Sequence, residues 1–165
     1  GSGTFNGTGQ DLTPNGGSNA LEVGDIDGDG DVDVMLGIAY SGNLVWKNNG
    51  NGTFTNTGQS LGTAPSWDIG FGDFDGDGDL DAYTANQGPD NRVWTNDGTG
   101  NFGSVAWTTE SDRHSIDVAW SDMDGDGWLD LVFANHGAPH SLYANLGGKP
   151  RPGTHLGGRR RGRCL

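Results

Sequence analysis

Fourteen of the 22 acidic residues lie in three nine-residue stretches, namely DIDGDGDVD from Asp25, DFDGDGDLD from Asp73 and DMDGDGWLD from Asp122. Each stretch has aspartate at positions 1, 3, 5 and 9 and glycine at position 6. Alternate carboxylates can converge on one point where glycine allows the loop to turn sharply. Carboxylates held so close repel one another and raise each other's pKa values unless a cation lies among them. The three stretches therefore predict cation-binding loops.

Calcium is the cation that this ligand set favours. Hard oxygen ligands in a flexible site suit Ca²⁺, Mg²⁺ is second choice because it needs a smaller octahedron, and zinc is disfavoured because the loops hold neither His nor Cys. We expect about three Ca²⁺ ions per chain. Carboxylates are expected from positions 1, 3, 5 and 9 and a backbone carbonyl from position 7. The expected ligands are Asp25, Asp27, Asp29, Asp31 and Asp33; Asp73, Asp75, Asp77, Asp79 and Asp81; and Asp122, Asp124, Asp126, Trp128 and Asp130.

The loops differ from two other calcium motifs. An EF-hand needs Glu at position 12 and helices on both sides, but position 12 is Leu36, Thr84 or Phe133 and the flanks are strand-like. The motif of the calcium-binding β-helix recurs every nine residues, whereas these loops recur every 48 or 49 residues. The alternative of ordinary acidic surface turns remains open. If calcium binds, we expect it to fasten a turn between two strands and to do no chemistry.

The loops recur at spacings of 48 and 49 residues, together with other parts of the sequence. Short apolar runs follow each loop, and Asn-Gly at 49–50 and Asp-Gly at 97–98 predict hairpin turns. Trp46, Trp94 and Tyr143 occupy one equivalent position, which predicts core between repeats. Four short strands per period are typical of propeller blades. The sequence thus predicts an all-β fold, with three four-stranded β-propeller blades of about 48–49 residues over residues 1–148.

The two ends of the array are predicted to be complementary. The chain opens on a fourth-strand pattern around Thr4 and Phe5, and the last regular segment is a third-strand pattern around Leu142 and Tyr143. Closed propellers join their ends through such a mixed blade. Three blades, however, are fewer than the usual four to eight.

Charge is divided unevenly along the chain. Residues 1–148 carry 22 acidic and three basic residues, a formal charge of −19, which disfavours nucleic acid and anionic membranes as partners. Residues 149–165 are basic and Gly/Arg-rich, and we expect a flexible tail; contact with the acidic body or with nucleic acid are the alternatives. No apolar run is long enough to insert in a membrane. A secretory signal is absent or already removed. Cys164 is the only cysteine, so no intrachain disulfide is expected.

These motifs resemble the FG-GAP/VCBS repeat, which also builds the β-propeller of integrin α subunits. The similarity rests on the acidic loops, on the Gly-x-Gly-Thr-Phe stretch at Gly50 and on the stretch from Gly72 to Phe102, and it covers about residues 1–148. The resemblance implies a propeller, usually of seven blades, with Ca²⁺ between the first two strands of a blade. It also implies an extracellular or cell-surface protein for adhesion, sugar binding or protein contact.

No catalytic set is evident. Asp112, His114 and Ser115 are neighbours in sequence, which does not make a triad, and no nucleophile-elbow pattern frames a serine. His136 and His140 align with Gln87 and Asn91, so they are not a repeated feature, and they are interpreted as surface residues rather than metal ligands. We therefore expect a protein that is not an enzyme.

The leading interpretation is a non-catalytic calcium-binding module for adhesion or for a carbohydrate or protein ligand. Its candidate contact residues are Tyr40, Trp67, Trp107, Trp128, His136 and His140. The alternative is a purely structural or self-assembling fragment of a larger propeller.

An open three-blade array would expose the outer faces of its terminal blades. We expect apolar residues such as Met35, Val45, Val132 and Leu142 to meet water there. The expected partner is a second copy in a head-to-tail dimer, or the remainder of a longer propeller.

Overall fold

The computed structural model describes residues 4, 6–13, 17–88, 90–109 and 114–147. The tail at 149–165, with Cys164, lies outside the described residues, as do Phe5 and Asp112. The described chain contains eleven strands and no helix. The strands are β1 (Ser18–Gly24), β2 (Asp33–Ile38), β3 (Asn43–Asn48), β4 (Phe54–Leu61), β5 (Ser66–Gly72), β6 (Asp81–Asn86), β7 (Arg92–Thr95), β8 (Ser104–Thr108), β9 (Ser115–Ser121), β10 (Asp130–Asn135) and β11 (Ser141–Tyr143).

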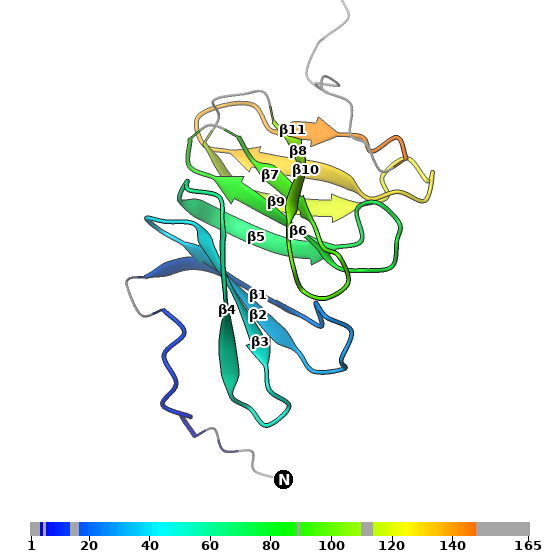
Figure 1. Ribbon diagram of the computed structural model, residues 1–165. Coiled ribbons are helices and arrows are strands. Elements are labelled where there is room, and N and C mark those ends of the chain that lie inside the picture. The colour runs from blue at the N-terminus through cyan, green and yellow to red at the C-terminus, as the bar shows by residue number, and fades with distance from the viewer. Residues whose placement is uncertain (1–3, 5, 14–16, 89, 110–113, 148–165) are drawn as a thin grey trace, which may run out of the picture.

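The strands form three antiparallel sheets, one per repeat. The first sheet has the order β1-β2-β3-β4, the second β5-β6-β7-β8 and the third β9-β10-β11. The first sheet lies below the other two in Figure 1, and β5 contacts both β1 and β9, so the second sheet lies between the first and the third. The predicted all-β fold of propeller-blade-like repeats is confirmed. Four strands per repeat are found in the first two sheets, whereas the described part of the third sheet holds three.

The turns fall where the sequence predicts them. Asn-Gly at 49–50 joins β3 to β4, and the Asn49 N–H donates to the Thr53 carbonyl at 2.9 Å. Asp-Gly at 97–98 joins β7 to β8, and the Asp97 N–H donates to the Asn101 carbonyl at 3.2 Å. Each acidic loop lies between the first and second strands of its sheet, so these two strands position its ends.

The core lies between the sheets. We call the face of a sheet that packs on the preceding sheet its leading face, and the opposite one its trailing face. The first interface buries Ile26, Met35, Val45, Leu61, Ile69, Ala82 and Phe102. The second buries Phe74, Tyr83, Ala85, Val93, Trp107, Val118, Leu131, Phe133 and Tyr143.

The expectation that Met35 and Val45 meet water is therefore wrong. Both side chains are fully buried, because they lie on the trailing face of the first sheet, which the second sheet covers. Val132 and Leu142, in the third sheet, are half-buried. The aromatic position predicted to be core between repeats is confirmed for Tyr143, which is 8 % exposed in the second interface, and for Trp94, which packs against the first. Trp46 is also 8 % exposed, but it packs with Val34, Leu36 and Ile38 of its own sheet, on the face that no other described sheet covers.

Glycine at the end of the first strand lets the next sheet approach closely. A β-carbon on Gly24 would lie 2.9 Å from Leu80 Cδ1 and 3.0 Å from Phe71 Cδ2. A β-carbon on Gly72 would lie 2.8 Å from Trp120 Cε2, in the same arrangement one sheet later. The repeated glycine therefore sets the spacing between neighbouring sheets.

The amino-terminal segment is not a strand in the described residues. Thr4 and residues 6–13 have no strand pairing, against the expectation of a fourth strand around Thr4 and Phe5. A strand there would need a third strand of another sheet beside it, and the described sheets do not close into a ring that supplies one. Nothing in the described part of the chain is a helix long and apolar enough to cross a membrane.

Candidate metal centres

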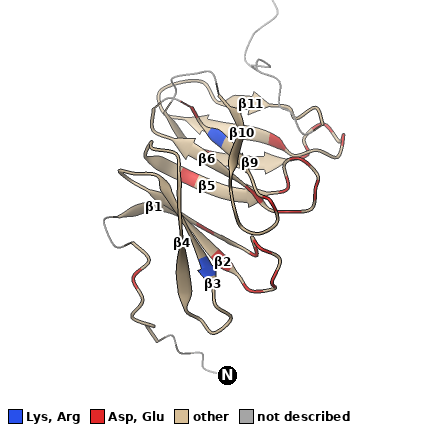
Figure 2. Cartoon of the chain, in the orientation of Figure 1, with Lys and Arg blue, Asp and Glu red and all other residues tan. Residues whose placement is uncertain are grey.

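The three acidic loops lie on the same side of the molecule. They follow β1, β5 and β9, whose ends face one way because the three sheets stack in parallel orientation, and the acidic loop residues, red in Figure 2, lie along that edge. Each loop connects two paired strands, so both of its ends are held by the sheet. The repeat thus produces three similar sites side by side.

Each loop is wound by the same internal hydrogen bond. The N–H of the position-6 glycine donates to Oδ2 of the position-1 aspartate in all three loops, over 3.0 to 3.1 Å; the donors are Gly30, Gly78 and Gly127. These glycines have φ of 92°, 97° and 92°, in the left-handed region that side chains disfavour. The tight winding predicted from glycine at position 6 is present in each loop.

The position-9 aspartate fastens each loop from beneath. In the second loop, Asp81 Oδ2 accepts from the Phe74 N–H at 2.8 Å and Oδ1 from the Asn96 N–H at 2.9 Å. Asp33 and Asp130 make the equivalent pairs of bonds in their own sheets. All three carboxylates are buried. Position 9 thus ties the loop to the end of the third strand, a role that the sequence did not reveal.

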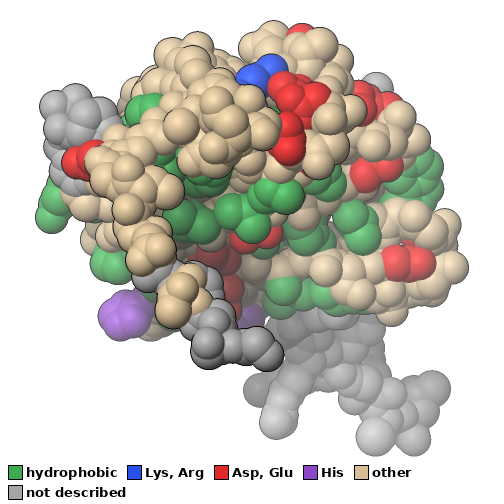
Figure 3. Space-filling model, turned by 90° about the horizontal axis from the view of Figure 1, so that it is seen from below, with side chains coloured by type: hydrophobic (Ala, Val, Ile, Leu, Met, Phe, Trp, Pro, Cys, Tyr) green, Lys and Arg blue, Asp and Glu red, His purple; other side chains and the backbone are tan. Residues whose placement is uncertain are grey.

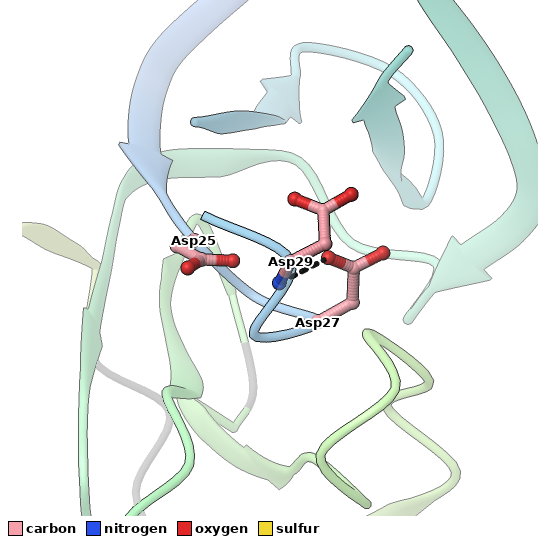
Figure 4. A group of neighbouring side chains, drawn as sticks. All are labelled: Asp25, Asp27 and Asp29. Carbon is pink, nitrogen blue, oxygen red and sulfur yellow. Dashed lines mark hydrogen bonds between the residues drawn. The ribbon is translucent and has the colours of Figure 1, made fainter. Parts of the chain in front are cut away.

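Carboxylate oxygens converge in every loop. Oxygens of three aspartates lie within 4.8 Å of one another in each, and the groups are Asp25, Asp27 and Asp29; Asp73, Asp75 and Asp81; and Asp122, Asp124 and Asp130. Figure 4 shows the first group on its loop, with the Asp29 N–H donating to Asp27 Oδ1 at 3.3 Å. The other expected carboxylate ligands, Asp33, Asp77 and Asp126, belong to the same loops but not to these groups, and Asp31 and Asp79 at position 7 are expected to offer a backbone carbonyl.

Two of these oxygens have no donor. Asp25 Oδ1 and Asp75 Oδ1 are buried, and no described residue hydrogen-bonds to them. A buried carboxylate oxygen left without a partner costs free energy. The sites therefore fit a cation that prefers oxygen ligands, which would coordinate those two oxygens directly.

Burial raises the pKa values of several loop carboxylates. Burial raises the pKa of Asp75, and the neighbouring Asp77 raises it further. Burial also raises the pKa of Asp81 to about 6 and raises the pKa of Asp33. Backbone N–H groups that donate to these two carboxylates partly oppose the rise. A cation among these groups would reverse the shifts, since it favours the charged carboxylates.

The first loop has a cation of its own. Lys47 Nζ lies 2.9 Å from Asp27 Oδ2 and also donates to the Thr99 carbonyl of the second sheet. The equivalent residues in the other sheets are Thr95 and Ala144, which carry no charge. The ammonium group therefore competes for one carboxylate of the first loop only.

Trp128 at position 7 has a packing role. Its ring lies against the second loop, where a β-carbon on Gly76 would be 2.7 Å from Trp128 Cζ3. The backbone N–H of Trp128 donates to Asp126 Oδ1 at 2.9 Å. The backbone N–H groups of Asp31 and Asp79 donate in the same way to Asp29 and Asp77. The tryptophan thus covers the neighbouring acidic loop.

A cavity lies at the opposite ends of the same strands. It has a volume of about 280 Å³, and its described lining residues are Trp67, Gln87, His114, Ile116 and His136. Trp67 and Ile116 are the second residues of β5 and β9, and the His136 N–H donates to the His114 carbonyl at 2.8 Å. The sequence singled out Trp67 and His136 but did not bring them together, because this requires both the pairing of β9 with β10 and the packing of β5 against β9.

The other candidate contact residues have different surroundings. Tyr40 is 89 % exposed, whereas Trp107 is 8 % exposed in the second interface. His140 Nδ1 accepts from the Asn135 N–H at 3.2 Å, as Asn91 Oδ1 accepts from the Asn86 N–H. The predicted alignment of His140 with Asn91 is therefore confirmed, and this His closes a turn.

Ser115 is not placed as a nucleophile. Its side chain is buried, its hydroxyl donates to Asn135 Oδ1 at 2.7 Å, and it accepts from Asn91 Nδ2 at 2.7 Å. The hydroxyl thus links the second and third sheets.

A family model for the FG-GAP-like repeat matches residues 25–84 and 73–133. The chain belongs to the FG-GAP-like repeat family. Each match runs from the first aspartate of one acidic loop through the next loop to a second strand, so it spans one structural repeat and the start of the next, and the two matches overlap at residues 73–84. FG-GAP-like repeats typically occur in extracellular proteins and are generally not enzymes. No curated protein matches the chain in sequence.

Proposed function

We propose that this FG-GAP-like repeat module is fastened by three calcium ions and serves extracellular adhesion through a carbohydrate or protein ligand, without catalysis. The observation that carries the calcium part is the convergence of three carboxylates in each loop, with buried, unpartnered oxygens on Asp25 and Asp75. When bound, Ca²⁺ supplies positive charge that neutralises the clustered carboxylates and joins the ends of two strands. The ligand residues are those of the three groups, and the remaining loop carboxylates add negative potential around them.

Calcium in these loops has a structural role, because each loop joins two paired strands of one sheet and the ion would hold its turns together. The described cavity lies at the far ends of the same strands. An extracellular location fits this reading, since sites that bind at about 10⁻⁴ M fill in the calcium outside cells and stay empty in the cytosol.

Calorimetry with Ca²⁺ tests this part. We expect about three ions per chain for the native protein and about two for Asp75→Ala. The matched control is Asp11→Ala, which removes an aspartate from an exposed turn outside the loops and should leave the count unchanged. Absence of binding at millimolar Ca²⁺ would refute the calcium proposal.

The cavity supports the ligand part of the proposal. The Trp67 side chain is 42 % exposed and offers an aromatic face, while Gln87, His114 and His136 offer hydrogen-bonding groups. No acidic residue is among the described lining residues, although residues 1–148 carry a formal charge of −19. An aromatic face with hydrogen-bonding groups around it suits a carbohydrate, which stacks through its C–H groups and hydrogen-bonds through its hydroxyls.

A glycan array with calcium present tests this assignment. We expect binding by the native protein, loss of binding by Trp67→Ala and retention by Tyr40→Ala, which removes an exposed aromatic residue outside the cavity. Absence of glycan binding by a calcium-loaded, folded chain would instead favour the purely structural alternative. The calcium count tests the calcium proposal and the glycan array tests the ligand proposal, so either proposal can be refuted while the other stands.

A further inference from the structure

The fourth strand of one sheet reaches across to the next sheet through a glutamine and a leucine. Gln59 in β4 donates through Nε2 to the Gly100 carbonyl at 2.8 Å and accepts through Oε1 from the Phe102 N–H at 2.8 Å. Two residues later, Leu61 is buried in the first interface. These two residues identify how a fourth strand contacts the sheet that follows it.

The amino-terminal segment contacts the first sheet in a similar way, although its glutamine donates to the carbonyl of Phe54 itself rather than to that of Gly52, the equivalent of Gly100. Gln10 donates through Nε2 to the Phe54 carbonyl at 2.6 Å and accepts from the Phe54 N–H at 2.9 Å. Two residues later, Leu12 packs against the cluster of Val34, Leu36, Ile38 and Trp46. Residues 7–12 read GTGQDL and residues 56–61 read NTGQSL. The segment thus occupies the place of a fourth strand that belongs to a preceding sheet, although it pairs with no strand.

The described part of the third sheet ends at its third strand. In the other sheets β4 and β8 follow the third strand at the outer edge, whereas β11 is the last strand of the third sheet among the described residues. At one end of the molecule, residues 6–13 occupy the place of a fourth strand but belong to no sheet. At the other end, the third sheet has no described fourth strand.

The leading face of the first sheet also exposes positions that are covered elsewhere. Leu21, Val23 and Val32 are 57 %, 51 % and 51 % exposed. Their equivalents in the second sheet are Ile69, which is 3 % exposed, and Phe71 and Leu80, which lie against Gly24. Seen from the side of the first sheet, hydrophobic side chains form a band across the molecule (Figure 3). Three apolar side chains at interface positions therefore lack the sheet that would cover them.

The trailing face of the third sheet is open in the same way. Met123 is 45 % exposed, whereas its equivalents Ile26 and Phe74 are 2 % and 0 % exposed. The two open faces also match in size. Gly24 and Gly72 receive bulky side chains of the next sheet, but the equivalent residue in the third sheet is Ser121, and the equivalent incoming residues are the smaller Val23 and Val32.

A polar contact can be assigned across the same faces. Asn96 Nδ2 donates to the Ile26 carbonyl at 2.7 Å, and Asn145 Nδ2 donates to the Phe74 carbonyl at 3.0 Å, each reaching from one sheet to the acidic loop of the preceding one. Asn48 is the equivalent residue of the first sheet, and Met123 follows the first aspartate of the third loop. The Asn48 amide donates to the Val32 carbonyl at 3.0 Å within the chain, and in a junction built like the internal ones it would also reach the Met123 carbonyl of another copy.

We propose that two copies of the chain join head to tail into a ring of six sheets, in which residues 6–13 of each copy form the fourth strand of the other copy's third sheet. Six sheets lie within the usual range of four to eight for propellers. Each junction would repeat the contacts of the two interfaces inside the chain. The assembly is independent of the proposed carbohydrate ligand.

Analytical ultracentrifugation in calcium tests the assembly. We expect a discrete species of twice the 17.2 kDa chain mass, and Leu21→Asp or Met123→Asp should convert it to monomer. The control Tyr40→Asp changes an exposed residue outside both faces and should keep the dimer. A native chain that remains monomeric at every concentration, or that forms open-ended polymers, would overturn the proposal.

Mixing the two variants separates a specific junction from general stickiness or misfolding. Each variant keeps the face that the other has lost, so an equimolar mixture should regain a dimer through one intact junction, whereas either variant alone should not. Failure of the mixture to associate would contradict the pairing of faces.

Hydrogen exchange tests the strand exchange itself. Amides of residues 6–13 should be protected in the native dimer and exchange rapidly in monomeric Met123→Asp. A dimer in which this segment exchanges as fast as in the monomer would overturn its assignment as a fourth strand.

Discussion

Each position-9 aspartate accepts hydrogen bonds from two backbone N–H groups. Each accepts one N–H from its own loop and one from the end of the third strand, with both carboxylate oxygens in use. An asparagine has only one acceptor oxygen, so it cannot replace such a carboxylate. The residue is therefore needed for the fold even without calcium.

We predict that Asp81→Asn lowers the free energy of unfolding by about 2 kcal/mol, because one buried N–H loses its acceptor and faces an NH₂ group. Urea unfolding in the presence of a chelator measures this loss separately from any metal effect. Asp11→Asn keeps its acceptor oxygen on an exposed turn and should stay within about 0.5 kcal/mol of the native value. Equal stability of Asp81→Asn and the native chain would contradict the structural role.

The lysine beside the first loop makes that loop unlike the other two. We predict that Lys47→Met raises the calcium affinity of the first loop about threefold to tenfold, because removal of the ammonium group frees Asp27. Calcium titration of the variant should show one tightened site and two unchanged ones. Arg92→Met removes a cation that lies 5.7 Å over the Trp94 ring and should alter none of the three affinities.

The first strands of the second and third sheets, β5 and β9, bring two acidic side chains together at a place outside the acidic loops. Asp68 on β5 accepts from the Val118 N–H on β9 at 3.0 Å, which fixes its carboxylate between the two sheets. Burial raises the pKa of Asp68, and a hydrogen bond with Asp117 and repulsion by it act in the same direction. Packing of the second and third sheets thus carries an electrostatic cost at neutral pH.

The sign of the resulting pH dependence follows from proton binding. Because the folded pKa of Asp68 lies above the unfolded value of 3.8, its contribution favours the folded state at low pH and is lost as pH rises through the folded pKa. We predict that Asp68→Asn increases the free energy of unfolding at pH 7 by up to about 1 kcal/mol and has no such effect near pH 4. Asp117→Asn should show part of the same gain. Denaturation in chelator between these pH values measures the difference, and a gain that is equal at all pH values would contradict it.

The sequence was most informative where the repeat forces residues into equal environments. The three loops, the strands beside them and the turns at 49–50 and 97–98 follow from local residue types. Which face of a strand is covered depends instead on whether another sheet follows. Period and hydropathy therefore could not distinguish buried Met35 from exposed Val23, nor could they bring His114 and Trp67 to one cavity.

At the scale of the whole molecule, calcium should act as a stabiliser. If each site binds at about 10⁻⁴ M, about 1 mM free Ca²⁺ adds roughly 1.4 kcal/mol per site, and three sites add about 4 kcal/mol. That is close to the whole stability of a marginal small domain. We therefore predict a large fall in melting temperature when a chelator replaces Ca²⁺, and only partial recovery with Mg²⁺. A melting temperature that the chelator leaves unchanged would contradict this prediction.

The placement of all three acidic loops at one edge makes the molecule electrically lopsided (Figure 2). An object with its negative charge gathered at one end experiences a torque near a charged surface, and this torque extends over about one Debye length. Near an anionic surface the loop edge turns away, and the opposite edge, which holds the Trp67 cavity, turns toward it. Filling the loops with divalent cations would weaken that torque, so calcium and ionic strength together set how strongly the module is oriented before it makes any contact.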